Sequence, residues 1–205
     1  MSKPARRVRD RWRSKEWYSI YTPTYFGEQS VASVPCASPA DMMGRVVENT
    51  LYDITGDFAH QSTKLYFLVT DVKNQRADTT LKGHEYATDY LRSLVRRGSS
   101  RVDSITAVTT KDGYSTAVSV IAFANGRLSA SQQHGLRAVM RQILEQKASS
   151  LTYDQLAQEM VLGKIGSDIY NEAKKVAPLR HVGVRKSKLL KRPQPLPAPP
   201  SEKPE

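Results

Sequence analysis

Hydrophobic and polar positions alternate most clearly within residues 101–123, where two runs rich in Val, Ile and Thr flank Asp112-Gly113. β-branched residues favour strands, and Asp-Gly is typical of a two-residue hairpin turn of type I′. Such a turn predicts an antiparallel hairpin with Ile105 opposite Val120. The alternation is lost in residues 118–123, so we expect the second strand to be covered on both faces.

Three earlier stretches also have strand chemistry. Residues 44–54 and 64–72 are rich in Val, Leu, Tyr and Phe, and the second stretch is the more apolar of the two. Asn74-Gln75 then predicts a turn into a shorter return strand at residues 77–81. Residues 21–43 contain three prolines and one glycine, so we expect an irregular strand-and-loop entry to the fold there.

Helical spacing replaces the alternation after residue 130. From Ser131 onward, apolar residues recur at positions 136, 139, 140, 143 and 144, which predicts an amphipathic helix that covers the hairpin. Thr152 and Gln155 form a capping-box pattern, so a second helix should begin at Thr152 and end near Gly163. A third helix is expected over residues 167–176, because the following proline disfavours helical geometry.

The order of these elements defines the fold class. Strands, a short helix between Thr88 and Gly98, the hairpin and then three helices predict an α+β fold. We expect a mainly antiparallel β-sheet, either open or closed into a barrel, that is covered by the C-terminal helices. The predicted segments are a basic N-terminal tail (1–15), an α+β body (16–177), a basic C-terminal segment (178–192) that is strand-like or extended, and a Pro-rich end (193–205). The first and last of these should lack stable structure on their own.

Positive charge is concentrated near the two ends of the chain. The net charge is +11 over 205 residues, but residues 1–15 carry seven Lys and Arg against one acid, and residues 173–192 carry eight against none. Residues 16–172 have 15 basic and 17 acidic side chains, a balance of −2. A nearly neutral body with basic ends indicates binding to a polyanion, because Lys and Arg release counterions from phosphates. Tails that only keep the protein soluble are the alternative.

Aromatic residues lie among the N-terminal basic ones, and such rings stack on unpaired bases in RNA-binding proteins. Trp12 has this setting, whereas Trp17 and Tyr18 lead directly into the body and are expected to anchor the tail to it. The candidate RNA-binding residues are Arg6, Arg7, Arg9, Arg11, Trp12, Arg13, Lys15, Arg180, Arg185, Lys186, Lys188, Lys191 and Arg192.

The sequence offers little support for an enzyme or a metal site. Cys36 is the only cysteine, which excludes an internal disulfide and a cysteine-cluster zinc site. Asp53 and Asp57 are expected to be a solvated pair rather than an acid/base pair. The histidines are scattered without metal-ligand spacing: His60, His84, His134 and His181. No apolar run reaches the roughly 18 residues that span a membrane, and the N-terminus has no apolar signal segment. We therefore expect a cytosolic protein that is not an enzyme and needs no cofactor.

Two other functions remain open at this point. Gly163-Lys164-Ile165-Gly166 lies between two predicted helices, and a GXXG loop in that setting clamps a nucleic-acid backbone in KH modules. A free RNA-binding regulator of KH type is therefore one alternative. The same glycines could instead end one helix and admit the next. The second alternative is a protein-interaction scaffold whose basic tails bind acidic partners.

A set of short segments in collinear order resembles one known family. The segments are Lys15-Glu16-Trp17-Tyr18 with Pro23, Gly44-Arg45-Val46-Val47-Glu48 with Leu51 and Asp53, Asp71-Val72, Gly83 with Asp89, Arg96-Arg97, Val102-Asp103, Thr109-Thr110-Lys111-Asp112-Gly113-Tyr114, Pro178-Leu179-Arg180, Val184-Arg185-Lys186, and Leu190-Lys191. Over residues 15–193 the chain resembles the S-three-A (e-type S-one) family of archaeal and eukaryotic small-ribosomal-subunit proteins.

The resemblance implies a structural protein of the small ribosomal subunit, and hence a place on the cytoplasmic ribosome. It also implies a position on the platform near the messenger-RNA exit, with small-subunit rRNA, neighbouring platform proteins and the nearby mRNA as partners. The chain lacks the long C-terminal extension of eukaryotic relatives, so it looks archaeal. The resemblance implies no role for its Pro-rich end, which stays open.

Overall fold

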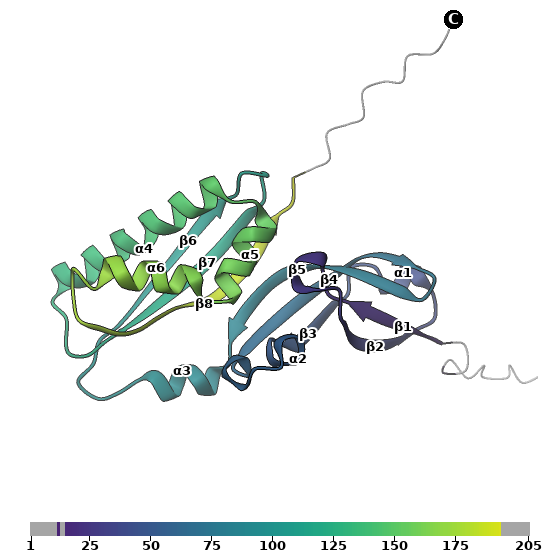
Figure 1. Cartoon of the computed structure of the whole chain (residues 1–205), viewed down its shortest axis with the longest axis horizontal. Coiled ribbons are helices and arrows are strands. Elements are labelled where there is room, and N and C mark those ends of the chain that lie inside the picture. The colour runs from purple at the N-terminus through teal and green to yellow at the C-terminus, as the bar shows by residue number, and fades with distance from the viewer. Residues whose placement is uncertain (1–11, 13–14, 194–205) are drawn as a thin grey trace, which may run out of the picture.

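The computed structural model describes residue 12 and residues 15–193, and its three long C-terminal helices lie on one face of an eight-stranded sheet (Figure 1). The strands are β1 (Glu16–Tyr21), β2 (Ser30–Cys36), β3 (Val46–Thr50), β4 (Thr63–Lys73), β5 (Arg76–Tyr86), β6 (Arg101–Thr109), β7 (Ser115–Ala124) and β8 (Leu179–Lys191). The helices are α1 (Pro39–Met42), α2 (Tyr52–Thr55), α3 (Thr88–Leu94), α4 (Ala130–Ser150), α5 (Tyr153–Val161) and α6 (Lys164–Ala173), with short 3-10 turns η1 (Thr24–Phe26) and η2 (Phe58–His60). The predicted α+β class is confirmed, and the described sheet is open rather than closed into a barrel.

Strand β5 joins the two halves of the sheet. One of its edges pairs with β4, while its other edge pairs in parallel with β1 at residues 76–78 and antiparallel with β8 at residues 83–85. The sheet order is β2-β1-β5-β8-β7-β6, with β4 and then β3 added beside β5. Because β8 lies between β5 and β7, the basic segment near the C-terminus holds the N-terminal strands against the hairpin.

Strands β6 and β7 form the predicted antiparallel hairpin, but the predicted turn was wrong. The loop consists of residues 111–113, and it is closed by hydrogen bonds from Thr110 N to Tyr114 O and from Gly113 N to Thr110 O, both 2.9 Å. Gly113 has a positive φ of 79°, whereas Asp112 does not have the positive φ that a type I′ turn requires. A three-residue loop with glycine in the left-handed region is the next most common hairpin connection.

The additional loop residue shifts the strand register by one position from the prediction. Ile105 faces Ser119 instead of Val120, and its side chain is 74% exposed. Val118 and Val120 point to the helices, and Phe123, on the opposite face, is also buried. The prediction that the end of β7 is covered on both faces is therefore confirmed.

The strong strand predicted at residues 64–72 is confirmed as β4, but the neighbouring predictions need correction. The strand predicted at residues 44–54 ends at Thr50, where the chain turns into α2. The return strand β5 has eleven residues and is not short. Asn74 and Gln75, both with positive φ (45° and 66°), make the two-residue turn between β4 and β5.

The C-terminal helices follow the predicted spacing, with shifted starts. The capping box at Thr152 is confirmed, while α4 is capped by Ser129, two residues before the predicted start at Ser131. Helix α6 begins at Lys164, three residues earlier than predicted. The short helix predicted between Thr88 and Gly98 is α3, which ends at Leu94 and has Ala87 at its N-cap position. The apolar stripe of α4 is buried against β6 and β7, as predicted.

Candidate nucleic-acid interface

Where β5 pairs with β8, the face of the sheet opposite the helices is exposed and brings together lysines from three strands. Cross-strand pairing places Lys188 beside Gly83 and Gly83 beside Tyr66. In the next row, Lys186 lies beside Glu85. The cross-strand row between these two contains Val118, His84 and Leu65. Their side chains point to the helix side and are buried there, since successive side chains of a strand point to opposite faces.

A groove with a volume of about 310 Å³ lies over Gly83 on this open face. Its lining side chains are those of Val46, Tyr66, Lys82, Glu85, Lys186 and Lys188, with Gly83 and Ser187 between them. An added Cβ on Gly83 would overlap with the carbonyl oxygen of Ser187, so the close approach of β5 and β8 requires glycine.

The charges in and around this groove do not cancel. Lys186 Nζ lies 2.8 Å from Glu85 Oε2, and Lys64 Nζ lies 2.7 Å from Glu48 Oε1. The hydrogen bond to Glu48 raises the pKa of Lys64. Lys82 and Lys188 make no ion pair within the described part of the chain. The groove therefore carries two uncompensated positive charges beside an aromatic ring.

The predicted C-terminal binding residues have different surroundings. Arg180 donates to the carbonyl of Leu94 at the end of α3, so it is engaged within the fold. Arg185 is half-buried, with its Nε enclosed and unpaired among the described residues. Lys191 is exposed, and Arg192 donates to Thr80 Oγ1 over 2.8 Å. Lys186 and Lys188 are the two members of the predicted set that meet at the groove.

The N-terminal set lies almost wholly outside the described residues. Trp12 and Lys15 are described, and Lys15 Nζ lies 4.6 Å from the centroid of the Trp12 ring, a cation–π contact. The members that lie outside the described residues are Arg6, Arg7, Arg9, Arg11 and Arg13.

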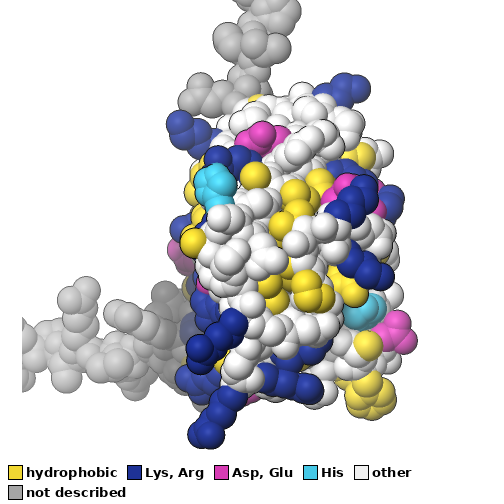
Figure 2. Space-filling view, turned by 90° about the vertical axis from the view of Figure 1, so that its left-hand side faces the viewer, with side chains coloured by type: hydrophobic (Ala, Val, Ile, Leu, Met, Phe, Trp, Pro, Cys, Tyr) yellow, Lys and Arg dark blue, Asp and Glu magenta, His cyan; other side chains and the backbone are white. Residues whose placement is uncertain are grey.

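Sequence reasoning missed a second basic surface at the end of the molecule where three loops meet. The loops are tied together by hydrogen bonds from Ser100 N to Gly126 O (3.0 Å) and from Asn125 N to Pro178 O (3.1 Å). They carry four cations that make no ion pair with any described residue: Arg96, Arg97, Arg127 and Lys174. Figure 2 looks onto this end and shows Lys and Arg side chains around a patch of hydrophobic ones. In the sequence, the Arg96-Arg97 pair was visible as a signal, and Lys174 was one of the eight basic residues of positions 173–192.

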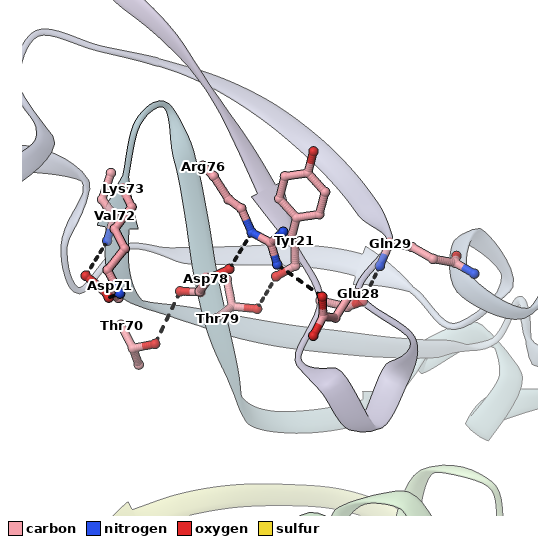
Figure 3. Close-up of polar contacts among 11 residues, drawn as sticks. Tyr21, Glu28, Gln29, Thr70, Asp71, Val72, Lys73, Arg76, Asp78 and Thr79 are labelled. Carbon is pink, nitrogen blue, oxygen red and sulfur yellow. Dashed lines mark hydrogen bonds and ion pairs between the residues drawn. The ribbon is translucent and has the colours of Figure 1, made fainter.

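Other cations are neutralised within the fold, as Arg76 shows (Figure 3). Its guanidinium donates to Asp78 over 2.8 Å and to Glu28 over 3.3 Å, and it lies 4.4 Å from the centroid of the Tyr21 ring. Both hydrogen bonds raise the pKa of Arg76. The Tyr21 contact joins β5 to β1 where the two strands pair in parallel, and the Glu28 contact joins β5 to the segment before β2, so Arg76 is a structural residue.

The GXXG segment has a packing role in this fold. Gly163 is the N-cap of α6, with a positive φ of 82°, and Gly166 is buried in the first turn of that helix. A Cβ on Gly166 would lie 3.1 Å from the carbonyl oxygen of Val182 and 3.4 Å from the Cα of Gly183. The segment thus lets α6 lie directly on β8, and it is not the exposed loop that a KH clamp needs.

The polar groups considered for catalysis have structural surroundings. Asp53 accepts hydrogen bonds from the backbone and the hydroxyl of Thr50, and Cys36 is buried. His84 is fully buried, donates from Nε2 to the Val184 carbonyl (3.2 Å) and accepts at Nδ1 from Ser187 Oγ (2.7 Å). No group of three His, Cys, Asp or Glu side chains in the described residues is arranged to hold a metal ion. No helix in that part of the chain is long and apolar enough to cross a membrane.

Fold and charge together place the chain in the class of basic α+β proteins. The comparisons with known proteins define the family. A model of the Ribosomal S3Ae family matches residues 3–193, and the chain belongs to this family. The resemblance seen in the sequence is thereby confirmed. Because the family is ribosomal, the chain is a structural component rather than an enzyme.

Three archaeal relatives are similar over most of their length. Each is named small ribosomal subunit protein eS1. The relative from Desulfurococcus amylolyticus is 45% identical over 92% of this chain and 88% of its own length. The relative from Staphylothermus marinus is 44% identical over 94% of this chain and 92% of its own. The relative from Sulfurisphaera tokodaii is 44% identical over 91% of this chain and 96% of its own.

Proposed function

We propose that this chain is a structural constituent of the small ribosomal subunit that binds small-subunit rRNA at the platform, near the mRNA exit. The observation that carries the proposal is the match to the Ribosomal S3Ae family over residues 3–193. The names of the archaeal relatives support the assignment to the small subunit. Neighbouring platform proteins and the mRNA near the exit are the further partners in this proposal.

Basic side chains near both ends of the chain hold the RNA backbone in this proposal. The N-terminal cations from Arg6 to Lys15 bind the phosphates of one RNA segment. The cations of β8, together with Arg192, bind those of a second segment. The four unpaired cations of the loop end add support, since they face solvent without an acidic partner among the described residues. Contacts of Lys and Arg with phosphates position a protein but carry little sequence information.

A density gradient of a native lysate is the primary test. After a high-salt wash, the chain should remain with the small subunit, because a structural constituent is held by packing within the assembled particle as well as by its salt-sensitive phosphate contacts. A chain that moves to the light fractions while the subunit stays whole would be a transient visitor, which contradicts the proposal. Nuclease treatment adds a control, since a protein-interaction scaffold would keep its complexes after the RNA is removed.

The salt dependence of RNA binding tests the role of the two basic ends. If about six to eight phosphates are contacted, the log–log slope of affinity against salt should be roughly −4 to −7, taking 0.7 to 0.9 per phosphate. Fluorescence anisotropy at several salt concentrations measures this slope. A slope of roughly −1 would rule out a pair of multi-residue grips.

A further inference from the structure

The groove over Gly83 is lined by side chains from four neighbouring strands, β3, β4, β5 and β8. Gly83 lies between Tyr66 and Lys188 in one cross-strand row, so one side of the Tyr66 side chain faces a position without a side chain. The close approach of Ser187 requires glycine at this position. The half-buried Tyr66 is therefore held on a rigid sheet beside an open space of about 310 Å³.

The charge around the Tyr66 ring selects an anionic ligand. Glu85, the acidic residue in the groove lining, already has Lys186 as its partner at 2.8 Å. Lys82 and Lys188 line the same groove and make no ion pair with a described residue. Lys82 is on β5 and Lys188 is on β8, so the two free ammonium groups come from adjacent strands. An anion in the groove would thus meet two cations without displacing an acid from either.

A positively charged groove with an aromatic ring is the combination that binds unpaired nucleic acid. The ring stacks on a base, and the ammonium groups contact the phosphates on either side. A paired base cannot do this, because its faces are covered by its neighbours in the helix. The volume is at the small end of the range for ligand sites, which suits one nucleotide.

We propose that the groove over Gly83 binds an unpaired RNA nucleotide, with its base against Tyr66 and its phosphates on Lys82 and Lys188. This inference rests on the proposed function in taking RNA as the ligand. It adds a contact that distinguishes single-stranded from duplex RNA, whereas the basic ends contact phosphates of either form.

Binding of the full chain to a labelled single strand of about 12 nucleotides, compared with the duplex of the same length, tests the proposal. Tyr66→Ala should weaken binding of the single strand by about 5- to 150-fold, since stacking on one aromatic ring is worth that range. Duplex binding should stay within about twofold of the unchanged chain, because no base is available for stacking. Tyr66→Phe keeps the ring and should bind like the unchanged chain. Phe58→Ala removes an aromatic side chain that is 78% exposed outside the groove and should leave both affinities unchanged.

The lysines are tested by the salt slope. Lys82→Ala and Lys188→Ala should each make the slope for the single strand shallower by about 0.7, the value for one phosphate of single-stranded nucleic acid. Lys175→Ala is the matched control, because Lys175 already pairs with Glu172 at 2.7 Å and does not line the groove.

Two results would overturn the proposal. One is a Tyr66→Ala variant that binds the single strand as well as the unchanged chain does. The other is an equal loss for single strand and duplex, because that loss would not come from stacking. A crosslinking experiment on the unchanged chain tests whether RNA occupies the groove, and its result does not depend on how the variant folds. RNA containing 4-thiouridine should crosslink to peptides with Tyr66 or Lys188, and crosslinks confined to residues 1–15 would contradict the groove.

Failure of this inference is distinguishable from failure of the proposed function. If Tyr66→Ala loses the crosslink but remains in the small-subunit fractions, the groove is supported and the ribosomal assignment stands. If the unchanged chain is absent from those fractions, the ribosomal assignment fails, while the binding and crosslinking assays still decide about the groove.

Discussion

Gly83 lies where β5 and β8 come closest, and no side chain fits there. An added Cβ would meet the backbone of Ser187 and Lys188, which cannot rotate away as a flexible side chain could. We expect Gly83→Ala to lower the free energy of unfolding by about 3 kcal/mol, the upper part of the range for overpacking. Urea unfolding measures the change. Gly126→Ala is the control, since nothing lies within 4 Å of a Cβ at that position, and it should change stability by less than about 0.5 kcal/mol. Equal stability of the two variants would contradict this account.

His84 gives the fold a predictable dependence on pH. Burial lowers the pKa of His84 from 6.5 to about 4, while hydrogen bonding to Val184 acts weakly in the other direction. Between these two values the unfolded chain binds more protons than the folded chain, so the free energy of unfolding falls as the pH drops through this window. Above pH 6.5 this contribution is constant. The loss should amount to about 3 kcal/mol when the pH reaches 4.

Urea unfolding at a series of pH values checks the role of His84. His84→Gln should remove most of the decrease in stability between pH 6.5 and 4. His181, whose pKa is also lowered by burial, contributes to the part that remains, as does Glu159, whose pKa is lowered in spite of burial by hydrogen bonds to Lys164 and Lys147. His134→Gln changes an exposed histidine and should leave the decrease as it is. An unaltered pH dependence in His84→Gln would refute the assignment.

At the scale of elements, a local N-cap defines the start of α5 and supports the contact of this helix with β5. The Thr152 hydroxyl accepts from Gln155 N, and the Gln155 side chain accepts from Thr152 N. The next residue, Tyr153, donates from its hydroxyl to the Leu81 carbonyl over 2.5 Å and so connects the helix to β5. Thr152→Ala should therefore destabilise the protein by about 1 kcal/mol, the usual contribution of an N-cap.

Chemical denaturation followed by circular dichroism measures the effect of the cap. Ser131→Ala is the matched control, because Ser131 is exposed on α4 and is not its N-cap. A Thr152→Ala variant as stable as the control would show that tertiary contacts alone hold the start of α5.

The hairpin shows how far local chemistry specifies an element. β-branched residues and Asp112-Gly113 identified both strands and the place of the turn. They did not decide between a loop of two residues and one of three. A change of one residue in loop length moves every side chain of one strand to the other face of the sheet. The burial of residues such as Val118 and Val120 in the core with α4 selects the three-residue loop.

At the scale of the whole molecule, the basic N-terminus should act as an independent grip. Residues 1–15 carry seven Lys and Arg against one acid, and they precede the first strand. Deletion of these residues should make the salt slope of RNA binding shallower by roughly 4, if about six phosphates are released at 0.7 each. Anisotropy titrations of the shortened and the full chain measure the difference.

The fold provides an internal comparison for this deletion. The double variant Gly163→Asp with Gly166→Asp would abolish RNA binding by a KH-type clamp. In this fold Gly166 lies against Val182 and Gly183, so we expect the double variant to lose stability instead. A KH mechanism would instead lose RNA binding with the fold intact, and it would be insensitive to the deletion. That pair of results would contradict the grip at the N-terminus.

The sequence by itself determined the class of the fold, the family, most element positions and the concentration of charge near the ends. Each of these depends on composition or on contacts a few residues apart, such as the capping box at Thr152. The tertiary structure alone decided which basic residues are available. Arg180 and Arg76 are held by other groups of the chain, whereas Lys82 and Lys188 meet beside Tyr66 because β8 pairs with β5 about a hundred positions earlier in the chain. Pairing between distant strands depends on how the whole core packs, and no local pattern of residues encodes it.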